Sequence, residues 1–507
     1  MGNQQNLVLP TGLMKIGEPS KIAQLLGQDG LFTSLLAALH MLAATAVSIH
    51  VLLSHREVRS SIGWIGLAWL SPVIGSLIYL VFGINRISRK AAQIGLLAPG
   101  AKPQEMPRAR EVLAQKLAAG DILRTTGIIS IAEAGDAITG LPLVAGNDLA
   151  FYCNGDQAYP EMIKAIKKAR HSIALTCYIF AADKAGQLFI DALIAAKKRG
   201  VMVRVLVDGV GSGYFRSPVV EALREGGVRV ERFLHNWAPW TMTFINLRNH
   251  KKMLIIDGKI AFTGGMNIAQ NNIGGKGKPK VMDVQARLKG PVVRQLMLNF
   301  AWDWDFTAQE ELLGDIWWPA LKRAGKTAMR GIASGPDENL GHIEEVFATA
   351  VEQAIKRIRI VTPYFLPEEP LFQVLQRAAL RGVEVDLVVP QQTNHFYFNW
   401  AIAAHLATFP LDGINCYLSP LPFDHSKLMS VDGNWCMLGS ANWDARSMRL
   451  NFEYQVECYG KQAAKMVDEL IEEKIANARK LTAKTLASRP VLVKLRDAGA
   501  RLFLPYL

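Results

Sequence analysis

A repeated spacing of histidine, lysine, aspartate and asparagine constrains this chain more than any other sequence feature. The two copies lie 175 residues apart and align without a gap: His250, Lys252, Asp257 and Asn267, and then His425, Lys427, Asp432 and Asn442. One such string arises easily by accident, whereas two in register are typical of a duplicated unit. We therefore expect two similar halves, each supplying half of one site.

Each copy also predicts its own local structure. Residues 253–256 and 428–431 are short, mainly apolar segments typical of buried strands. The dipeptides that follow, Asp257-Gly258 and Asp432-Gly433, favour tight turns that would reverse each strand into a hairpin. Although both aspartates belong to the catalytic motif, we interpret them as structural or supporting groups at these turns.

The residue types in the repeat suit a phosphodiester anion. Imidazole can attack phosphorus and can move protons near neutral pH. Residues i and i+2 of an extended segment point to one face, so each histidine would share a site with its lysine, a fixed positive charge. Asn267 and Asn442 can donate amide N–H groups to phosphate oxygens. Because lysines supply the positive charge, we expect no metal and no cofactor.

Longer strings around the repeat resemble the phospholipase D superfamily, and bacterial cardiolipin synthases in particular. They are residues 248–252 (RNHKK), 362–365 (TPYF), 439–447 (GSANWDARS) and 451–453 (NFE), with the C-terminal ending. The resemblance implies that His250 is a nucleophile forming a phosphohistidine and that His425 is the acid and base; the symmetry of the repeat does not choose between them. Arg446 and Ser447 would either extend the phosphate or headgroup contacts or begin a helix.

Two carboxylates occupy matching positions after the histidines. Asp283 follows His250 by 33 residues and Glu453 follows His425 by 28, each within an alternating strand pattern. Both resemble the carboxylates that orient histidines in this family by fixing the tautomer of the imidazole. The alternative is that they are surface carboxylates on strands.

The regions before each motif predict an α/β fold built twice. Strands through Thr176 and Thr362 are followed by helices near 185–199 and 369–381, each ending at a glycine before another apolar strand. We expect two tandem phospholipase D-like α/β domains with pseudo-twofold symmetry, their sheets facing each other. The expected ranges are an N-terminal segment (1–30), a transmembrane helical hairpin (31–84), a basic linker (85–110), a first domain (111–325) and a second domain (326–507).

Two apolar runs predict the membrane hairpin. Leu31 to Leu53 and Ile62 to Ile84 each contain 23 residues without a formal charge, enough to cross a hydrocarbon core. Pro72 would kink the second helix, and a buried soluble hairpin is the alternative. More basic residues flank the side of the chain ends than the connecting turn, which favours a multi-pass protein of the bacterial inner membrane with a cytoplasmic catalytic region.

Composition agrees with a membrane-associated, reduced protein. The formal net charge of +13 favours anionic partners such as lipid surfaces, although a generally basic surface is the alternative. Five scattered cysteines indicate reduced core thiols. Trp237, Trp240 and Phe244, with the basic loop 274–280, would dip the rim of the site into an anionic leaflet, or else form a core cluster and a solvated loop.

These observations predict a membrane-bound phosphatidyltransferase. The resemblance implies that two phosphatidylglycerol molecules become cardiolipin and glycerol. A hydrolytic phospholipase D that releases phosphatidic acid is the first alternative, because the motifs do not exclude water as the acceptor. A nuclease is disfavoured by the membrane anchor, and a non-catalytic membrane scaffold is disfavoured by two intact motifs. The oligomeric state is left open.

Overall fold

The computed structural model describes residues 21–54, 58–83, 109, 111–113, 122–235, 247–275, 277, 279–408 and 413–502. Trp237, Trp240, Phe244, two lysines of the basic loop, most of the linker 85–110 and the turn between the two apolar runs lie outside these ranges. The chain divides after Arg86 into an N-terminal unit and a second unit, Ile87–Leu507. The predicted boundaries at 110/111 and 325/326 stay predictions.

The N-terminal unit contains one helix long and apolar enough to cross a membrane among the described residues. It is the part of α1 (Lys21–Leu53) from Phe32 to Leu53. The second predicted span is not one continuous helix: it consists of α2 (Val58–Leu70), α3 (Ile74–Ile78) and the π-helix η1 (Tyr79–Gly83). The break falls at Ser71-Pro72-Val73, because Pro72 has no N–H to continue the ladder and Val73 has a positive φ of 60°.

The second unit contains both halves of the repeat. After α6 (Ile122–Thr139), the first half comprises β1 (Val144–Cys153), α7 (Asn154–Lys168), β2 (Ser172–Cys177), α8 (Lys184–Lys198), β3 (Met202–Asp208), α9 (Pro218–Glu225), β4 (Arg229–Phe233), β5 (Arg248–Asn249), β6 (Met253–Ile256), β7 (Ile260–Gly264), η3 (Gln270–Asn272), β8 (Val281–Met282), β9 (Val284–Lys289) and α10 (Val293–Ala308). The second half comprises β10 (Thr327–Ser334), α11 (His342–Glu352), β11 (Arg357–Val361), β12 (Phe365–Leu366), α12 (Glu369–Leu380), β13 (Glu384–Pro390), α13 (Phe396–Thr408), β14 (Ile414–Ser419), β15 (Phe423–Asp424), β16 (Leu428–Val431), β17 (Trp435–Gly439), β18 (Trp443–Asp444), α14 (Ala445–Arg449), β19 (Asn451–Tyr459), α15 (Lys461–Ala476), β20 (Arg479–Leu481), α16 (Ala483–Ala487) and α17 (Val491–Arg501).

The local predictions around the motifs are confirmed. β2–α8–β3 and β11–α12–β13 are parallel βαβ units, and Gly200 and Gly382 end their helices with φ of 88° and 86°. β6–β7 and β16–β17 are antiparallel hairpins. Their turns have positive φ at both central positions, Asp257-Gly258 (51° and 60°) and Asp432-Gly433 (52° and 65°), as a type I′ turn requires.

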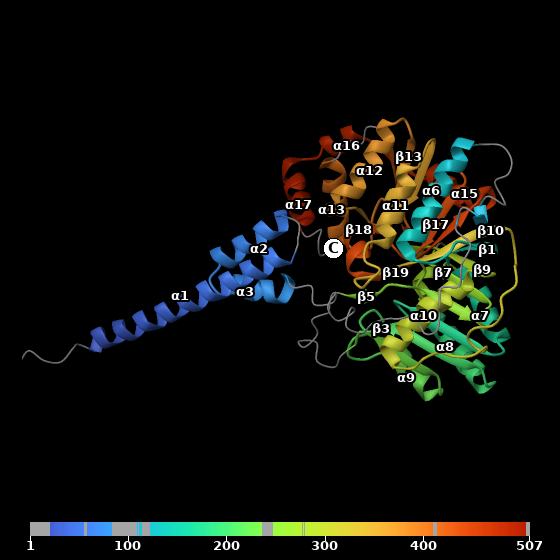
Figure 1. The fold of residues 1–507 in the computed structure, drawn as a ribbon, viewed down its shortest axis with the longest axis horizontal. Helices are drawn as coiled ribbons and strands as arrows, with labels where there is room; N and C mark the ends of the chain where they lie inside the picture. The colour runs from blue at the N-terminus through green and yellow to red at the C-terminus, as the bar shows by residue number, and fades with distance from the viewer. Residues whose placement is uncertain are drawn as a thin grey trace, which may run out of the picture. The chain divides into compact units, whose positions relative to one another are not determined.

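The two halves join edge to edge and do not face each other as separate sheets. Their strands form one 16-stranded sheet in the order β20-β14-β13-β11-β16-β17-β19-β10-β1-β9-β7-β6-β2-β3-β4, with β5 attached to β19. The antiparallel pair β1–β10 lies near the centre, and the next six strands on either side follow the same order, with β20 added at the edge of the second half, which confirms the pseudo-twofold symmetry (Figure 1). Edge-to-edge pairing satisfies backbone groups that two separate sheets would leave at an open edge.

Helices cover both faces of this sheet. α10 and α15 pack on one face over a core that includes strands of both halves, with Phe300, Trp304 and Val467 almost fully buried. The other face is covered by α7–α9 over the first half and by α6 and α11–α13 over the second. The shared core fixes the two halves to each other, and therefore fixes the two histidine motifs.

Candidate active site

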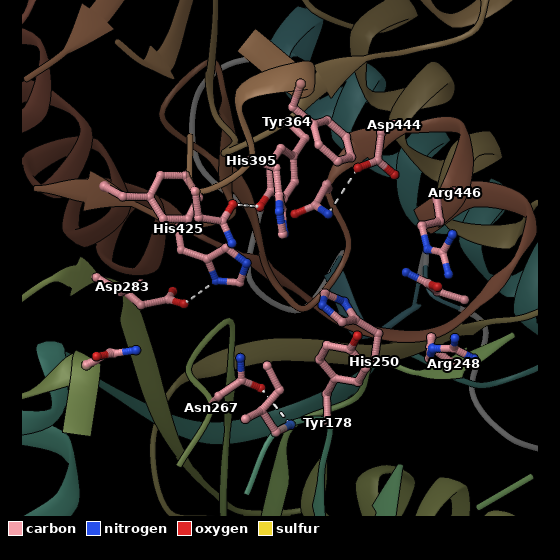
Figure 2. A pocket seen from close by; sticks show the side chains of 18 of the residues that line it. Tyr178, Arg248, His250, Asn267, Asp283, Tyr364, His395, His425, Asp444 and Arg446 are labelled. Carbon is pink, nitrogen blue, oxygen red and sulfur yellow. Dashed lines mark hydrogen bonds and ion pairs between the residues drawn. The ribbon is translucent and has the colours of Figure 1, made fainter. Parts of the chain in front are cut away.

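The two histidines meet in one cavity. Its volume is about 480 Å³, and its lining includes His250, His425, Asn267, Asn442 and Asp283. The imidazole centroids lie 6.5 Å apart with their planes at 83° (Figure 2). The duplicated motifs therefore form a single site, as the repeat predicts.

Each histidine is held by the backbone of the opposite half. β5, just before His250, pairs in parallel with β19, and the His250 N–H donates to the carbonyl of Phe452 at 2.9 Å. In the same way β15, just before His425, pairs with β8, and the His425 N–H donates to the carbonyl of Met282 at 2.8 Å. Glu453 follows Phe452 in β19, and Asp283 follows directly after β8, which places each carboxylate beside the histidine of the other half.

The orienting carboxylates are therefore crossed between the halves. His250 Nδ1 lies 2.9 and 3.0 Å from the two carboxylate oxygens of Glu453, and His425 Nδ1 lies 2.8 Å from Oδ2 of Asp283. Glu453 and Asp283 are buried, so the alternative of surface carboxylates is wrong. With a proton on Nδ1 donated to the carboxylate, each ring keeps Nε2 for chemistry.

Burial sets the protonation of the imidazoles. It lowers the pKa of His250 to about 4 against the attraction of Glu453, and it lowers the pKa of His425 to about 4 together with the charge of Lys427. Burial opposes ionisation of Glu453, but the neighbouring His250 and Lys252 still hold its pKa below the usual range. At neutral pH the site thus contains neutral imidazoles, one of them hydrogen-bonded to an ionised carboxylate.

The lysines stand behind the histidines and do not line the cavity. The Nζ atoms of Lys252 and Lys427 donate to the backbone carbonyls of His250 and His425, and Lys427 Nζ is also 2.9 Å from His425 Nδ1. Burial lowers the pKa of Lys252 to about 7 and that of Lys427 to about 8. Direct contact between either ammonium and a phosphate oxygen stays a prediction, while their charges already act on both imidazoles.

The two asparagines are held differently. The Asn267 side-chain oxygen accepts from the Ile179 N–H at 3.1 Å, which leaves its NH₂ group as the donor for a ligand. The Asn442 NH₂ group donates to Asp444 at 3.1 Å, and its buried Oδ1 has no hydrogen-bond partner among the described residues. Burial raises the pKa of the Asp444 carboxyl to about 6. The Asn442 NH₂ group is thus already engaged by Asp444, and a contact of the Asn267 NH₂ group with phosphate stays a prediction.

Asp257 and Asp432 organise the hairpin turns. Asp257 accepts from the N–H groups of residues 170, 171 and 172, and Asp432 accepts from those of residues 355, 356 and 357. The structure places neither among the residues that line the cavity. These contacts support the interpretation of both aspartates as structural groups, and they do not support a catalytic role for either.

Several cavity residues received no role from the sequence. The Tyr178 ring lies 5.0 Å from that of His250, and the Tyr364 ring lies 6.3 Å from that of His425, so the two tyrosines obey the same symmetry. The spacing Thr-x-Tyr in both βαβ units carried this signal. Arg248, Asn394 and His395 also line the cavity, and no pattern in the sequence singled them out as ligand contacts.

Arg446 and Ser447 make different contacts in the structure. Arg446 lines the cavity. The Ser447 Oγ instead accepts a hydrogen bond from the Asn442 N–H at 3.1 Å. The Ser447 N–H donates to Asp444 at 2.6 Å, where α14 begins. Both residues lie in the first turn of α14, whose N-cap is Asp444, and of the two only Arg446 also lines the cavity.

Comparison with known proteins defines the class and the family. The family described as "Cardiolipin synthase, PLD-like domain" matches residues 162–304 and 347–475, and "Phospholipase_D-nuclease N-terminal" matches 42–83. A cardiolipin synthase of Listeria monocytogenes is 27% identical over 487 residues, covering 94% of this chain and 100% of the relative. Cardiolipin synthase 1 of Bacillus cereus is 26% identical and covers 93% of each chain.

A solved structure agrees on the fold. The crystal structure of phosphatidylserine synthase from Haemophilus influenzae Rd KW20 has a TM-score of 0.60 at 16% identity, covering 74% of this chain and 100% of that one. The family match and the two cardiolipin synthase relatives define an enzyme of the phospholipase D superfamily, a phosphatidyltransferase. Because the family match extends over more than half of its length, the chain belongs to the phospholipase D-like family of cardiolipin synthases.

Proposed function

We propose that this membrane-associated enzyme joins two phosphatidylglycerol molecules into cardiolipin and releases glycerol. The observation that supports this most is the pair of imidazoles, 6.5 Å apart in one cavity, that can bracket a single phosphorus atom. An in-line displacement needs the attacking group and the leaving-group acid on opposite sides of phosphorus, which one histidine cannot provide. The lipid class comes from the family.

In the first step, the lone pair of His250 Nε2 attacks phosphorus and the bond from phosphorus to the glycerol headgroup breaks. The departing oxygen takes a proton from the imidazolium of His425, so glycerol leaves and a phosphatidyl-histidine remains. The bound phosphodiester anion favours this proton, because a negative charge raises the pKa of a neighbouring imidazole. In the second step, the hydroxyl of another phosphatidylglycerol returns its proton to His425 while its oxygen displaces His250 from phosphorus.

The surroundings of the rings favour this assignment of roles. After burial, the strongest influence on His250 is the attraction of Glu453, which stabilises the positive charge of a phospho-imidazolium. After burial, the strongest influence on His425 is the repulsion from Lys427, which makes its imidazolium a readier proton donor. A nucleophile that gains positive charge and an acid that loses it need these opposite environments. We therefore assign the nucleophile to His250 and the acid and base to His425.

The remaining groups stabilise charge on the transferring phosphoryl. Lys252 and Lys427 supply positive charge close behind the imidazoles, and the Asn267 NH₂ group donates to a phosphate oxygen. The step uses no metal and no cofactor. We further propose that α1 anchors the enzyme in the bacterial inner membrane, that the chain is multi-pass and that the catalytic unit is cytoplasmic.

The test of the overall reaction is product analysis. Purified full-length protein in vesicles that contain phosphatidylglycerol alone should yield cardiolipin and glycerol in equal amounts by mass spectrometry. Phosphatidic acid and glycerol without cardiolipin would replace this proposal with the hydrolytic alternative, and no turnover would favour the scaffold.

The test of the covalent mechanism is trapping of the intermediate. A phosphatidyl ester with a nitrophenol leaving group needs little acid assistance, so His425→Ala should still load the enzyme with acid-labile lipid, whereas His250→Ala should not. His171→Ala, at an exposed position, is the matched control and should behave as wild type. Label on His250→Ala and none on His425→Ala would exchange the two roles, and label on neither would refute the phosphohistidine.

A further inference from the structure

The proposed reaction places two phosphate groups in one cavity. The acceptor phosphatidylglycerol has its own phosphodiester, joined to the attacking hydroxyl through the glycerol. In the proposed step His250, His425 and Asn267 contact the phosphate that is transferred, and the lysines stand behind the histidines, so the second anion needs another cationic contact nearby. Arg248 and Arg446 line the same cavity on the side of His250 away from Asp283 (Figure 2).

Arg248 is placed at a suitable distance from the nucleophile. It lies in β5, two positions before His250, and side chains at i and i+2 of an extended segment share one face. Two residues of extended chain span about 6–7 Å, which is comparable to the span of a glycerol bridge with an oxygen at either end. The Tyr178 ring lies 5.0 Å from that of His250, and burial raises the pKa of the Tyr178 hydroxyl against the attraction of the Arg248 charge.

Arg446 reaches the same place from the other half. It lies in the first turn of α14, and burial together with the neighbouring positive charge of Arg248 lowers its pKa. Two guanidinium groups that repel each other at the wall of a cavity form a binding site for an anion, since a phosphate between them turns the repulsion into two attractive contacts.

The nearest carboxylates are already engaged by the backbone. Asp208 accepts from the N–H groups of Val210, Gly211 and Asn249 at 2.7 to 2.9 Å. Asp444 accepts from the Ser447 N–H. Burial raises the pKa of the Asp208 and Asp444 carboxyls, and both carboxylates attract Arg446. Arg248 and Arg446 nevertheless both line the cavity, where a bound phosphate can meet their guanidinium groups.

We propose that Arg248 and Arg446 bind the phosphodiester of the acceptor lipid, in a subsite separate from that of the transferred phosphorus. This inference rests on the proposed function. The arginines hold the acceptor so that its glycerol hydroxyl faces the phosphatidyl-histidine; the new phosphorus–oxygen bond forms, the phosphorus–nitrogen bond breaks, and the proton goes to His425. A high local concentration of this hydroxyl favours transfer over attack by water.

Two acceptors that differ only in a phosphate group test the subsite. Phosphatidylglycerol carries the second phosphate, whereas free glycerol does not and returns the phosphatidyl-histidine to phosphatidylglycerol. Arg248→Gln and Arg446→Gln should lower cardiolipin formation about tenfold or more, the usual effect of a lost charge-assisted hydrogen bond. Exchange of isotopically labelled glycerol into phosphatidylglycerol should stay close to wild type, which also reports that the variants are folded.

A matched control and a soluble acceptor make the result specific. Arg449→Gln removes another arginine of α14, one that pairs with Glu368 outside the cavity, and it should change neither reaction. Wild type should prefer glycerol 1-phosphate to glycerol as acceptor, and the Arg248 and Arg446 variants should lose this preference, with Arg→Lys variants in between.

Three outcomes would overturn the subsite. An equal loss of exchange and cardiolipin formation would place the arginines on the transferred phosphate or in the fold, and no loss of either would remove them from the reaction. An unchanged preference for glycerol 1-phosphate would contradict phosphate recognition. Failure of the proposed function itself is seen separately, as wild-type protein that exchanges glycerol or hydrolyses lipid but forms no cardiolipin.

Discussion

Replacing Glu453 with glutamine tests how the crossed carboxylate acts. Both Glu453 oxygens lie within 3.0 Å of His250 Nδ1, and Glu453 also accepts hydrogen bonds from Ser440 and Asn451. The residue is fully buried. Glu453→Gln keeps the shape and one acceptor oxygen and removes the charge. Any effect on the chemical step therefore reports mainly the electrostatic contribution of the carboxylate.

The size of the effect follows from the charge that His250 gains. As the phosphorus–nitrogen bond forms, the imidazole becomes positively charged about 4 Å from the centre of the carboxylate, an attraction of about 4 kcal/mol at an effective dielectric constant near 20. Losing it should lower kcat by about a thousandfold, since about 1.4 kcal/mol corresponds to a factor of ten. The free imidazole is neutral at pH 7, its pKa being about 4, so KM should change only a few-fold.

Comparison with Asp283→Asn identifies which step each carboxylate serves. Glu453→Gln should be equally slow with phosphatidylglycerol and with a nitrophenyl phosphatidyl ester, because nucleophilic attack is impaired in both. Asp283→Asn removes the carboxylate that orients His425 for proton transfer, so the good leaving group should restore the burst of nitrophenol. A loss of less than tenfold in kcat for Glu453→Gln would refute the charge argument. Restoration of Glu453→Gln by the good leaving group would assign the acid to His250.

The remaining predictions concern pH, the turns and metal ions. Lys252 and Lys427 are charged only below their pKa values of about 7 and 8, so kcat/KM should fall as pH rises through this range. Lys252→Arg should shift this fall in kcat/KM to higher pH. A pH profile that stays flat to pH 9 would contradict a role for these charges. Burial holds the pKa of both imidazoles at about 4, below the ordinary 6.5. The stability that depends on neutral histidines is therefore complete above pH 6.5 and is lost as the pH falls towards 4. Tm should fall across this window, and it should fall less steeply in a His250→Gln/His425→Gln variant. Asp257→Asn should lower the free energy of unfolding by about 1–3 kcal/mol, because the side chain that accepts the backbone N–H groups at the turn loses its charge. The kcat per folded molecule should stay unchanged. A large loss of kcat with unchanged stability would support a catalytic role for Asp257. Exhaustive chelation should leave cardiolipin formation intact, and recovery with one specific ion after a complete loss would disprove the metal-free mechanism.

Much of the fold could be predicted because its signals are local. The βαβ units follow from apolar strands and helix-ending glycines, and the hairpins follow from Asp257-Gly258 and Asp432-Gly433, whose positive φ angles the dipeptides favour. The joining of the halves through β1–β10 depends on strands far apart in sequence, and no residue pattern encodes that partner. The second apolar run is predicted as one helix kinked at Pro72, whereas the positive φ of Val73 turns the kink into a break, which hydropathy does not encode.

The site shows the same division between local and distant information. His250 and His425 could be chosen from residue type and repeat position, and Asp283 and Glu453 from the resemblance to the phospholipase D superfamily. Their pairing could not, because sequence order places Asp283 after His250 whereas the structure places it beside His425. The position of Lys252 behind its histidine was also hidden, because alternation gives the face of a residue and not its depth.

The crossed contacts make each half dependent on the other for catalysis. The half that provides His250 lacks the carboxylate that would stabilise its charged form, and the half that provides His425 lacks the one that would orient its proton. The strands that carry these carboxylates also hold the backbone of the opposite histidine. A separation of the halves would therefore remove the ring contact, the tautomer control and the charge stabilisation together. Retention of both motifs is explained by this interdependence, because neither half alone contains a histidine with its carboxylate.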